Sequence, residues 1–254
     1  MILGLIPARL NSQRLPGKPL LKIDGLPMVI HVLKRSLLSK KLDNVIVCAD
    51  DKSIVDVVKK FGGNAILTSK KHKNGTERIC EVAKKINSEM IIDIQCDEVF
   101  LNPFHLDKVI DFHKKNNNFD IIIPHSLTSS YANENIVKIV ENKEGKILYL
   151  SRADIHYYFR QKKLFLKKHL DFISFKKKSL LKYCNLKKSI NEKVEGIELM
   201  RAIDNNFNVG TMQINTDVFS INTLNDLKSA KKIMKTCKIR KKYWIKNFLI
   251  LFLT

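Results

Sequence analysis

Residues 2–20, ILGLIPARLNSQRLPGKPL, join an apolar run to a basic loop. The apolar residues 2–6 predict a buried strand, and the proline, glycine, asparagine and serine of residues 7–18 predict a loop. Ligands bind at the carboxyl ends of the strands of a parallel sheet. The stretch therefore predicts an α/β fold with a ligand site directly after its first strand.

The loop carries three cations within ten residues, Arg9, Arg14 and Lys18. Gly17 allows the backbone to approach a ligand closely. Arginine side chains bind phosphate oxygens through paired hydrogen bonds and lysine acts as a point charge, so the loop suits a triphosphate. It matches neither G-x-x-x-x-G-K-[ST] nor G-x-G-x-x-G. By charge alone, a solvated basic turn remains an alternative.

Apolar runs and helical periodicity alternate along the next hundred residues, which indicates a mostly parallel, covered sheet. We expect strands over 44–49, 65–67, 90–94 and 120–124, and helices over 27–38, 50–61, 76–86 and 103–115.

The pattern changes after residue 125. A hairpin over 136–140 and 146–150 with an Asn-Lys-Glu-Gly turn, a Lys-rich stretch of weak periodicity over 161–188, a helix over 195–203, a strand over 208–214 and a helix over 222–234 are expected. We interpret 1–234 as one domain, with a first half of about 1–125, an inserted smaller lobe of about 126–215, and a tail over 235–254.

Two further motifs follow predicted strands or open predicted helices. Asn74-Gly75-Thr76-Glu77-Arg78 lies at a helix start, where backbone N–H groups donate to a base or phosphate oxygen. Asp93-Ile94-Gln95-Cys96-Asp97-Glu98 ends a buried strand, where Asp97 is placed to hold Mg²⁺ and Gln95 to contact a base edge. The alternatives are that Glu77 is only a first-turn helix residue and that Asp97 only caps the next element.

The chain of 254 residues is 44% hydrophobic, enough for a sizeable core. Its net charge of +21 is compatible with a nucleic-acid or membrane-surface protein, and that class remains a hypothesis. The basic residues are mostly scattered lysines without interleaved aromatic residues, which argues against single-strand binding. We therefore expect a solvated surface with an anionic small-molecule substrate and no nucleic acid.

Five widely spaced cysteines without a C-x-x-C pair predict neither a disulfide framework nor a cysteine zinc site, and favour a reducing compartment. The amino-terminal apolar run lacks a basic lead and ends at Pro7, so we expect no signal peptide. No apolar stretch reaches about 18 residues, the length needed to span a bilayer. These features together predict a cytoplasmic protein.

Four stretches in this order and spacing resemble the 3-deoxy-manno-octulosonate cytidylyltransferases: IPARLNSQRLPGKPL at 6–20, GLPMVIHVLKRS at 25–36, KNGTERICEV at 73–82 and DIQCDE at 93–98. Weaker matches extend the resemblance over about residues 2–234. It implies a Rossmann-like, glycosyltransferase-A-like nucleotidyltransferase fold whose inserted lobe binds sugar and forms a homodimer.

The resemblance also implies a reaction, in which CTP activates a 3-deoxy-ulosonic acid such as Kdo to a CMP-sugar, releasing pyrophosphate, for lipopolysaccharide or capsule synthesis. Mg²⁺ would be the cofactor. By motif match, the triphosphate would be held by Arg9, Ser12, Arg14 and Lys18, the nucleotide contacted by Thr76, Arg78 and Gln95, the metal held by Asp97 and Asn222, and the sugar acid bound by Arg152 and His169.

The sequence departs from the family pattern at four places. Cys96 replaces a glycine, Asn222 aligns with a second metal carboxylate, and Gly196 replaces a histidine. Arg201-Ala202 aligns with a Glu-Gln pair that would face the sugar, which predicts altered acceptor recognition. Two alternatives therefore stay open: a sugar nucleotidyltransferase with another acceptor, and a nucleotide-binding homologue of low activity.

The tail 238–254, KIRKKYWIKNFLILFLT, lies beyond the resemblance and carries a basic cluster followed by a short apolar run. Three hypotheses apply to it: a membrane-surface anchor, a segment packed on the body or on a partner, and an unstructured end.

Overall fold

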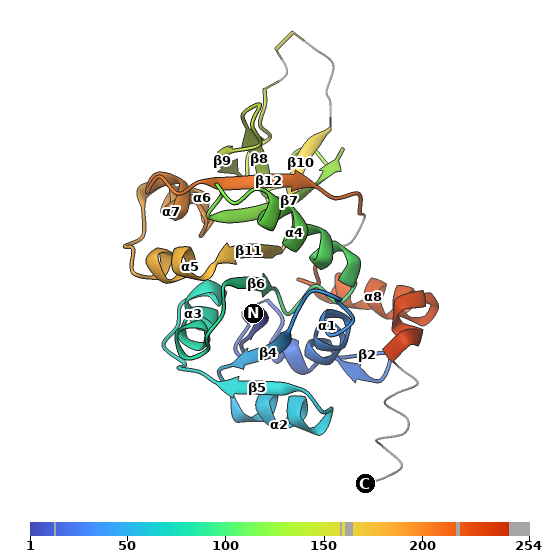
Figure 1. The fold of residues 1–254 in the computed structure, drawn as a ribbon. Helices are drawn as coiled ribbons and strands as arrows, with labels where there is room; N and C mark the ends of the chain where they lie inside the picture. Colours follow the sequence, from blue (N-terminus) through green and yellow to red (C-terminus); the bar gives the residue numbers. More distant parts are fainter. Residues whose placement is uncertain (13, 158, 161–164, 217–218, 244–254) are drawn as a thin grey trace. The chain divides into compact units, whose positions relative to one another are not determined.

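The chain forms two compact units (Figure 1). The computed structural model describes residues 1–12, 14–157, 159–160, 165–216 and 219–243. Unit 1 combines Met1–Asp107 with Val218–Thr254, and unit 2 is Lys108–Asp217. An inserted lobe is therefore present as expected. The division at Asp107 falls within α4 (Pro103–Lys115), earlier in the chain than the boundary near residue 125 that the sequence suggests.

Unit 1 contains a parallel sheet in the order β5–β4–β1–β6. Leu5 of the central strand pairs with Ile46 on one side and with Asp93 on the other. Because all four strands run in one direction, the loops that follow β1, β4 and β6 leave from the same edge. The strands are β1 (Ile2–Ala8), β4 (Asn44–Ala49), β5 (Asn64–Leu67) and β6 (Met90–Ile94). The expected α/β fold with a parallel sheet is confirmed.

The helices of unit 1 begin at polar caps that the sequence supplies. Asp51 accepts the Ser53 N–H at 2.9 Å, Asn74 accepts the Glu77 N–H at 2.8 Å, and Thr223 forms a reciprocal capping box with Asp226. Figure 1 shows α2 beside β5. The helices are α1 (Met28–Ser36), α2 (Lys52–Lys60), α3 (Gly75–Lys85) and α8 (Leu224–Thr236), close to the expected bounds.

A short turn and hairpin lie between the basic loop and α1, where the sequence predicts no regular structure. The 3₁₀ turn η1 (Lys18–Leu20) is followed by β2 (Lys22–Ile23) and β3 (Leu26–Pro27), which pair with each other. Elements of two or three residues are too short for a periodic signal.

Unit 2 is built around β7 (Ile121–Thr128). One edge of β7 pairs in antiparallel with β10 (Leu166–His169) and β11 (Phe172–Lys176), and the other edge pairs in parallel with β12 (Val209–Gln213). The expected hairpin is confirmed as β8 (Lys138–Glu141) and β9 (Ile147–Ser151), with Gly145 at φ +75° in its turn, and β8 also pairs with β10.

Two parts of unit 2 differ from the sequence-based expectation. The Lys-rich stretch contains β10, β11 and α5 (Lys177–Cys184), although it shows weak periodicity. The single helix expected over 195–203 is wrong, because Gly196 adopts φ +63° and ends α6 (Ile190–Glu195), and α7 (Met200–Asp204) follows it. Glycine in this left-handed conformation is a common helix stop.

The described part of the tail packs on unit 1. Arg35 is fully buried and donates to the Leu101 carbonyl at 3.0 Å and to Cys237 Sγ at 2.9 Å. Its guanidinium also lies 5.8 Å from the ring centre of Tyr243, which is itself buried. Arg240 pairs with Asp24. These contacts agree with the hypothesis of a packed segment up to Tyr243, whereas the apolar run over 244–254 lies outside the described residues.

The part of the chain that the structure describes has no helix both long and apolar enough to cross a membrane. All five cysteines are free thiols.

Three buried histidines are held by hydrogen bonds to hydroxyl groups. His31 Nδ1 lies 2.8 Å from the Tyr243 hydroxyl, His113 Nδ1 2.6 Å from the Ser174 hydroxyl, and His125 Nδ1 2.7 Å from the Thr211 hydroxyl. Burial lowers the pKa of each imidazole from 6.5 to about 4.

We predict that the protein loses stability as the pH falls from 6.5 to 4. In this window the unfolded chain binds protons at these histidines and the folded chain does not, so stability rises with pH and levels off above 6.5. Melting followed by circular dichroism should give a Tm lower by at least about 5 °C at pH 5 than at pH 7. His125→Gln should flatten the slope, and the exposed His156→Gln should not. A Tm that is constant over this range contradicts the prediction.

Candidate active site

The basic loop after β1 is held in shape by its own backbone. The Gly17 N–H donates to the Leu10 carbonyl at 3.1 Å, and the Leu10 N–H donates to Asp50 Oδ1 at 2.9 Å. Leu15 is buried and anchors the middle of the loop. Gly17 adopts φ +66°, a conformation that other residues rarely take, so the glycine is needed here for its backbone freedom.

Lys18 lies at the centre of a cluster formed by the loop, the end of β6 and the start of α8. Its ammonium is 2.6 Å from Asp97 Oδ2 and 3.3 Å from Asn222 Oδ1. Arg14 donates to the same Asn222 oxygen at 3.0 Å. The structure therefore brings together four residues that lie far apart in the sequence: Arg14, Lys18, Asp97 and Asn222.

The donor set of this cluster fits Mg²⁺. Asp97 and Asn222 each direct a side-chain oxygen at Lys18 Nζ, and oxygen is the ligand that Mg²⁺ prefers. The described residues contain no group of three or more His, Cys, Asp or Glu side chains able to hold a metal. Mg²⁺ is commonly bound by one or two carboxylates together with substrate phosphates, and this pair of oxygens suits that arrangement.

Gln95 and the start of α3 lie close to the end of β1. Gln95 Nε2 donates to Asp93 Oδ1 at 3.0 Å. A Cβ on Gly75 would lie 3.1 Å from Pro7 Cγ and 3.4 Å from Gln95 Nε2, so a larger residue at this position would crowd both neighbours. Thr76, the next residue, is buried in the first turn of α3. The two motifs predicted to contact the nucleotide are thus adjacent.

Arg78 is buried and tied to its own unit. Its guanidinium donates to the Thr68 hydroxyl at 2.7 Å and to the Ser69 carbonyl at 3.2 Å, and it lies 3.5 Å from Asp50 Oδ2. Asp50 also accepts the Leu10 N–H, so Asp50 links Arg78 to the basic loop. A direct contact between Arg78 and a nucleotide stays a prediction.

Three further residues, two in the basic loop and one after β6, differ in their exposure to solvent. Arg9 is exposed directly after β1, and Ser12 is half-buried in the loop. Cys96 is buried, and burial together with the neighbouring Asp97 raises the pKa of its thiol to about 12. A raised pKa favours the neutral thiol at Cys96.

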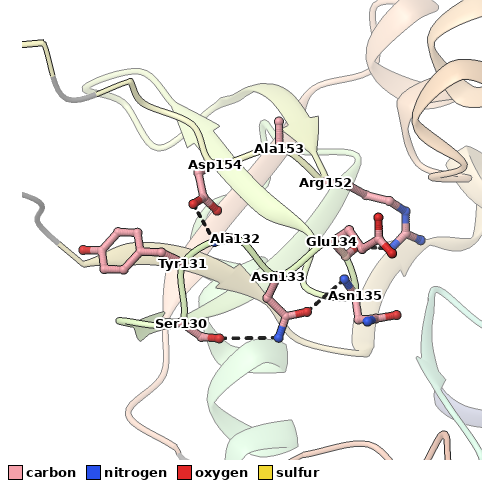
Figure 2. A pocket seen from close by; sticks show the side chains of 9 residues that line it. All are labelled: Ser130, Tyr131, Ala132, Asn133, Glu134, Asn135, Arg152, Ala153 and Asp154. Atoms are coloured by element: carbon pink, nitrogen blue, oxygen red, sulfur yellow. Dashed lines mark hydrogen bonds between the residues drawn. The ribbon is translucent and has the colours of Figure 1, made fainter.

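A polar cavity of about 630 Å³ lies in unit 2 (Figure 2). It is formed by the loop Ser130–Asn135 and by Arg152–Asp154, which directly follow β9. The Arg152 guanidinium donates to the carbonyls of Glu195 at 3.0 Å and Glu134 at 2.8 Å. These guanidinium contacts go to backbone carbonyls, which do not neutralise its charge, while the Glu195 carboxylate accepts the Arg152 backbone N–H at 2.9 Å.

None of the site residues predicted from the sequence lies in the Ser130–Asn135 loop, which forms one wall of this cavity. Its polar composition after a buried strand is the signal that identifies such a loop. His169 lies in β10, with Nδ1 3.3 Å from Asp171 Oδ1, and is not among the residues that line the cavity. Its predicted role at the sugar acid stays a prediction.

The expectation that Arg201 faces the acceptor is wrong. Arg201 is buried, and its Nε and Nη2 donate to the two carboxylate oxygens of Glu192 at 2.7 and 2.6 Å. The guanidinium also lies 5.0 Å from the ring centre of Tyr183. Ala202 is fully buried beside it. This pair therefore belongs to the interior of unit 2.

Comparison with known proteins identifies the family. A family model described as cytidylyltransferase matches residues 3–215. This chain belongs to the cytidylyltransferase family. Within the family, it is 34% identical over 248 residues to the 3-deoxy-manno-octulosonate cytidylyltransferase of Thermodesulfovibrio yellowstonii, covering 91% of this chain and 97% of the relative.

Other cytidylyltransferases agree with this placement. The chain is 33% identical to the 3-deoxy-manno-octulosonate cytidylyltransferase of Fusobacterium nucleatum, covering 94% of this chain and 98% of the relative. A solved CMP:2-keto-3-deoxy-manno-octonic acid synthetase complexed with CTP superposes with a TM-score of 0.89 at 30% identity, covering 92% of this chain and 98% of the other. A Leptospira borgpetersenii cytidylyltransferase shares the fold at 18% identity, with a TM-score of 0.64, covering 98% of this chain and 95% of the other.

We predict that Lys18→Met lowers kcat/KM at least about 100-fold, because a charge-assisted contact to a triphosphate is lost. Arg14→Met should act in the same direction. The measurement is pyrophosphate release at saturating acceptor, and the exposed Lys22→Met is the control. Near-unchanged turnover in both loop variants would show that this loop does not hold the nucleotide.

We predict that Arg201→Met destabilises unit 2 by about 3 kcal/mol, because it removes both hydrogen bonds to the buried Glu192 carboxylate and leaves it only the Lys188 ammonium at 3.9 Å. The double variant Arg201→Met with Glu192→Gln should recover much of this loss. Urea unfolding measures both. Stability equal to that of the original chain in the single variant would contradict the buried ion pair.

Proposed function

We propose that this protein transfers the cytidylyl group of CTP to a 3-deoxy-ulosonic acid, Kdo or a close relative, forming a CMP-sugar and pyrophosphate for lipopolysaccharide or capsule synthesis. The family assignment supports the reaction class. The observation that carries the proposal is the convergence of Arg14, Lys18, Asp97 and Asn222 in one cluster after β1. These residues supply the cations and oxygen ligands that a nucleoside triphosphate with Mg²⁺ requires.

In the proposed mechanism, unit 1 holds the nucleotide. Arg9, Arg14 and Lys18 bind the phosphates with Ser12, and their charges stabilise the negative charge that develops on the leaving pyrophosphate. Thr76 and Gln95 contact the nucleoside, with Arg78 beneath the loop. Asp97 and Asn222 would hold Mg²⁺, which supplies further charge neutralisation of the triphosphate when bound.

Unit 2 holds the acceptor in this mechanism. Arg152 is suited to the carboxylate of a ulosonic acid, because a guanidinium pairs with a carboxylate through two parallel hydrogen bonds. His169 would contact the sugar. The anomeric hydroxyl oxygen forms a bond to the α-phosphorus of CTP, the bond to the pyrophosphate oxygen breaks, and the hydroxyl proton leaves to solvent. Positioning and electrostatics carry this chemistry without a covalent intermediate.

The protein is proposed to act as a homodimer in the cytoplasm. Tyr157, Phe159 and Phe165 are 87%, 80% and 65% exposed and line a groove of about 470 Å³ in unit 2. Exposed aromatic side chains gathered in a groove are typical of an interface. The five free cysteines support a reducing compartment.

Pyrophosphate release with CTP, Mg²⁺ and a panel of ulosonic acids tests the proposed function. We expect release only when both CTP and a 3-deoxy-ulosonic acid are present, with little activity when UTP or ATP replaces CTP. CTP binding by calorimetry without release on any acid would instead support a nucleotide-binding homologue of low activity. Release with an unrelated sugar phosphate would support another acceptor.

We predict that Asn222→Asp tightens Mg²⁺ binding, because it adds a second carboxylate to the pair of oxygens beside Lys18. The midpoint of a Mg²⁺ titration, followed by calorimetry with CTP present, should fall at least about threefold. Asn225→Asp adds the same charge at an exposed position of α8 and serves as the control. A midpoint that moves equally in both variants would place Asn222 away from the metal.

A further inference from the structure

Lys138 is a fully buried lysine with no place in the mechanism above. It lies in β8, where its backbone pairs with Ser151 of β9 on one side and with Lys168 of β10 on the other. Its ammonium donates to the Asn133 carbonyl at 2.6 Å and to the Arg152 carbonyl at 2.6 Å. It also lies 3.4 Å from Asp154 Oδ1.

These partners belong to the two segments that form the cavity of Figure 2. Asn133 lies in the Ser130–Asn135 loop, and Arg152 and Asp154 lie in the segment after β9. Asp154 Oδ2 accepts the Ala132 N–H at 2.7 Å, so the same two segments are joined a second time. Lys138 and Asp154 thus join the two segments that form the cavity.

The energetics indicate that this lysine serves more than packing. Taking an ammonium out of water is expensive, and an apolar side chain of similar volume is often as stabilising or more so. The Lys138 ammonium donates to two backbone carbonyls, and Asp154 Oδ1 at 3.4 Å forms an ion pair with it rather than a hydrogen bond. A methionine would fill the space but could hold neither carbonyl, so the charged residue is needed to fix the backbone of both walls.

The Lys138 cross-link fixes the backbone on which the Arg152 side chain is carried. Three of its N–H groups donate to backbone carbonyls, those of Glu134, Glu195 and Gly196. A guanidinium has five N–H groups, which leaves two for a carboxylate. Lys138 holds the Arg152 carbonyl and, through Asn133, the neighbour of Glu134, so the Glu134 end of this arrangement depends on it.

We propose that Lys138 is a positioning residue for the acceptor: its ammonium holds the Asn133 and Arg152 carbonyls, and through them the Arg152 guanidinium, in the arrangement that receives a sugar-acid carboxylate. The inference rests on the proposed function, in which the cavity binds the acceptor. Lys138 does not touch the substrate in this arrangement and acts through Arg152.

Steady-state kinetics of Lys138→Met, alone and combined with Arg152→Ala, test the inference. We expect the KM for the sugar acid to rise at least about 10-fold in Lys138→Met, while the KM for CTP stays within about twofold. In the Arg152→Ala background, Lys138→Met should add less than about twofold, because its effect passes through Arg152. Lys143→Met, at an exposed lysine of the hairpin turn, is the control.

The outcomes separate the inference from the function on which it rests. If Arg152→Ala leaves the KM for the sugar acid unchanged, the assignment of the acceptor site is wrong. If Arg152→Ala raises this KM and Lys138→Met does not, only the role of Lys138 is wrong. An effect of Lys138→Met that is equal on both KM values, or fully additive with Arg152→Ala, also overturns it.

A second variant covers the case in which Lys138→Met does not fold. Lys138→Gln keeps two N–H donors without the charge, and we expect it to fold with a sugar-acid KM raised at least about threefold and an unchanged KM for CTP. A KM equal to that of the original chain overturns the inference. Failure of Lys138→Gln to fold also overturns it, because Lys138 would then serve stability alone.

Discussion

The parallel pairing of β1 with β4 and β6 is the constraint on which unit 1 depends. It sends the loops after these strands, and after β5 beside β4, out from one edge of the sheet, so that residues distant in sequence meet there. The order of the strands thus provides the positions, and the residues after each strand provide the chemistry. The basic loop, the 74–76 turn and the Gln95–Asp97 segment all owe their adjacency to this arrangement.

Charge is distributed unevenly within that edge. Lys18 and Arg14 both donate to the side-chain oxygen of Asn222, which carries no charge. Lys18 also forms an ion pair with the Asp97 carboxylate. The net charge of +21 attracts an anionic ligand at longer range. Arg78 contributes differently, because Asp50 and two further oxygens hold it inside the unit as support for the loop.

The sequence predicts unit 1 well because its strands are continuous apolar runs and its helices begin at caps. It predicts unit 2 less well for physical reasons. β10 reads Leu-Lys-Lys-His, and Lys167 there pairs with Glu141, so the strand is stabilised by partners that no local pattern reveals. Gly196 is a helix stop that periodicity alone overlooks.

Among the site residues, the convergence of Lys18, Asp97 and Asn222 follows from the resemblance to a known family. The same reasoning failed at Arg201, because its partner Glu192 lies on another helix and an ion pair between helices leaves no mark in sequence spacing. The sequence also gives no sign that Lys138 is buried. A lysine in a strand is usually exposed, and only the carbonyls that surround its ammonium show otherwise.

The packing of the tail on α1 has a consequence for biosynthesis. Unit 2 is one continuous segment, Lys108–Asp217, whereas unit 1 is completed by residues that include Cys237, Arg240 and Tyr243. During synthesis from the amino terminus, all of unit 2 leaves the ribosome before these residues do. Arg35 and His31 then lack their tail partners until Cys237 and Tyr243 emerge. All residues of unit 2 are therefore available for folding before those of unit 1. Unit 1, which begins at the amino terminus, can complete its packing only after residues 237–243 have been synthesised.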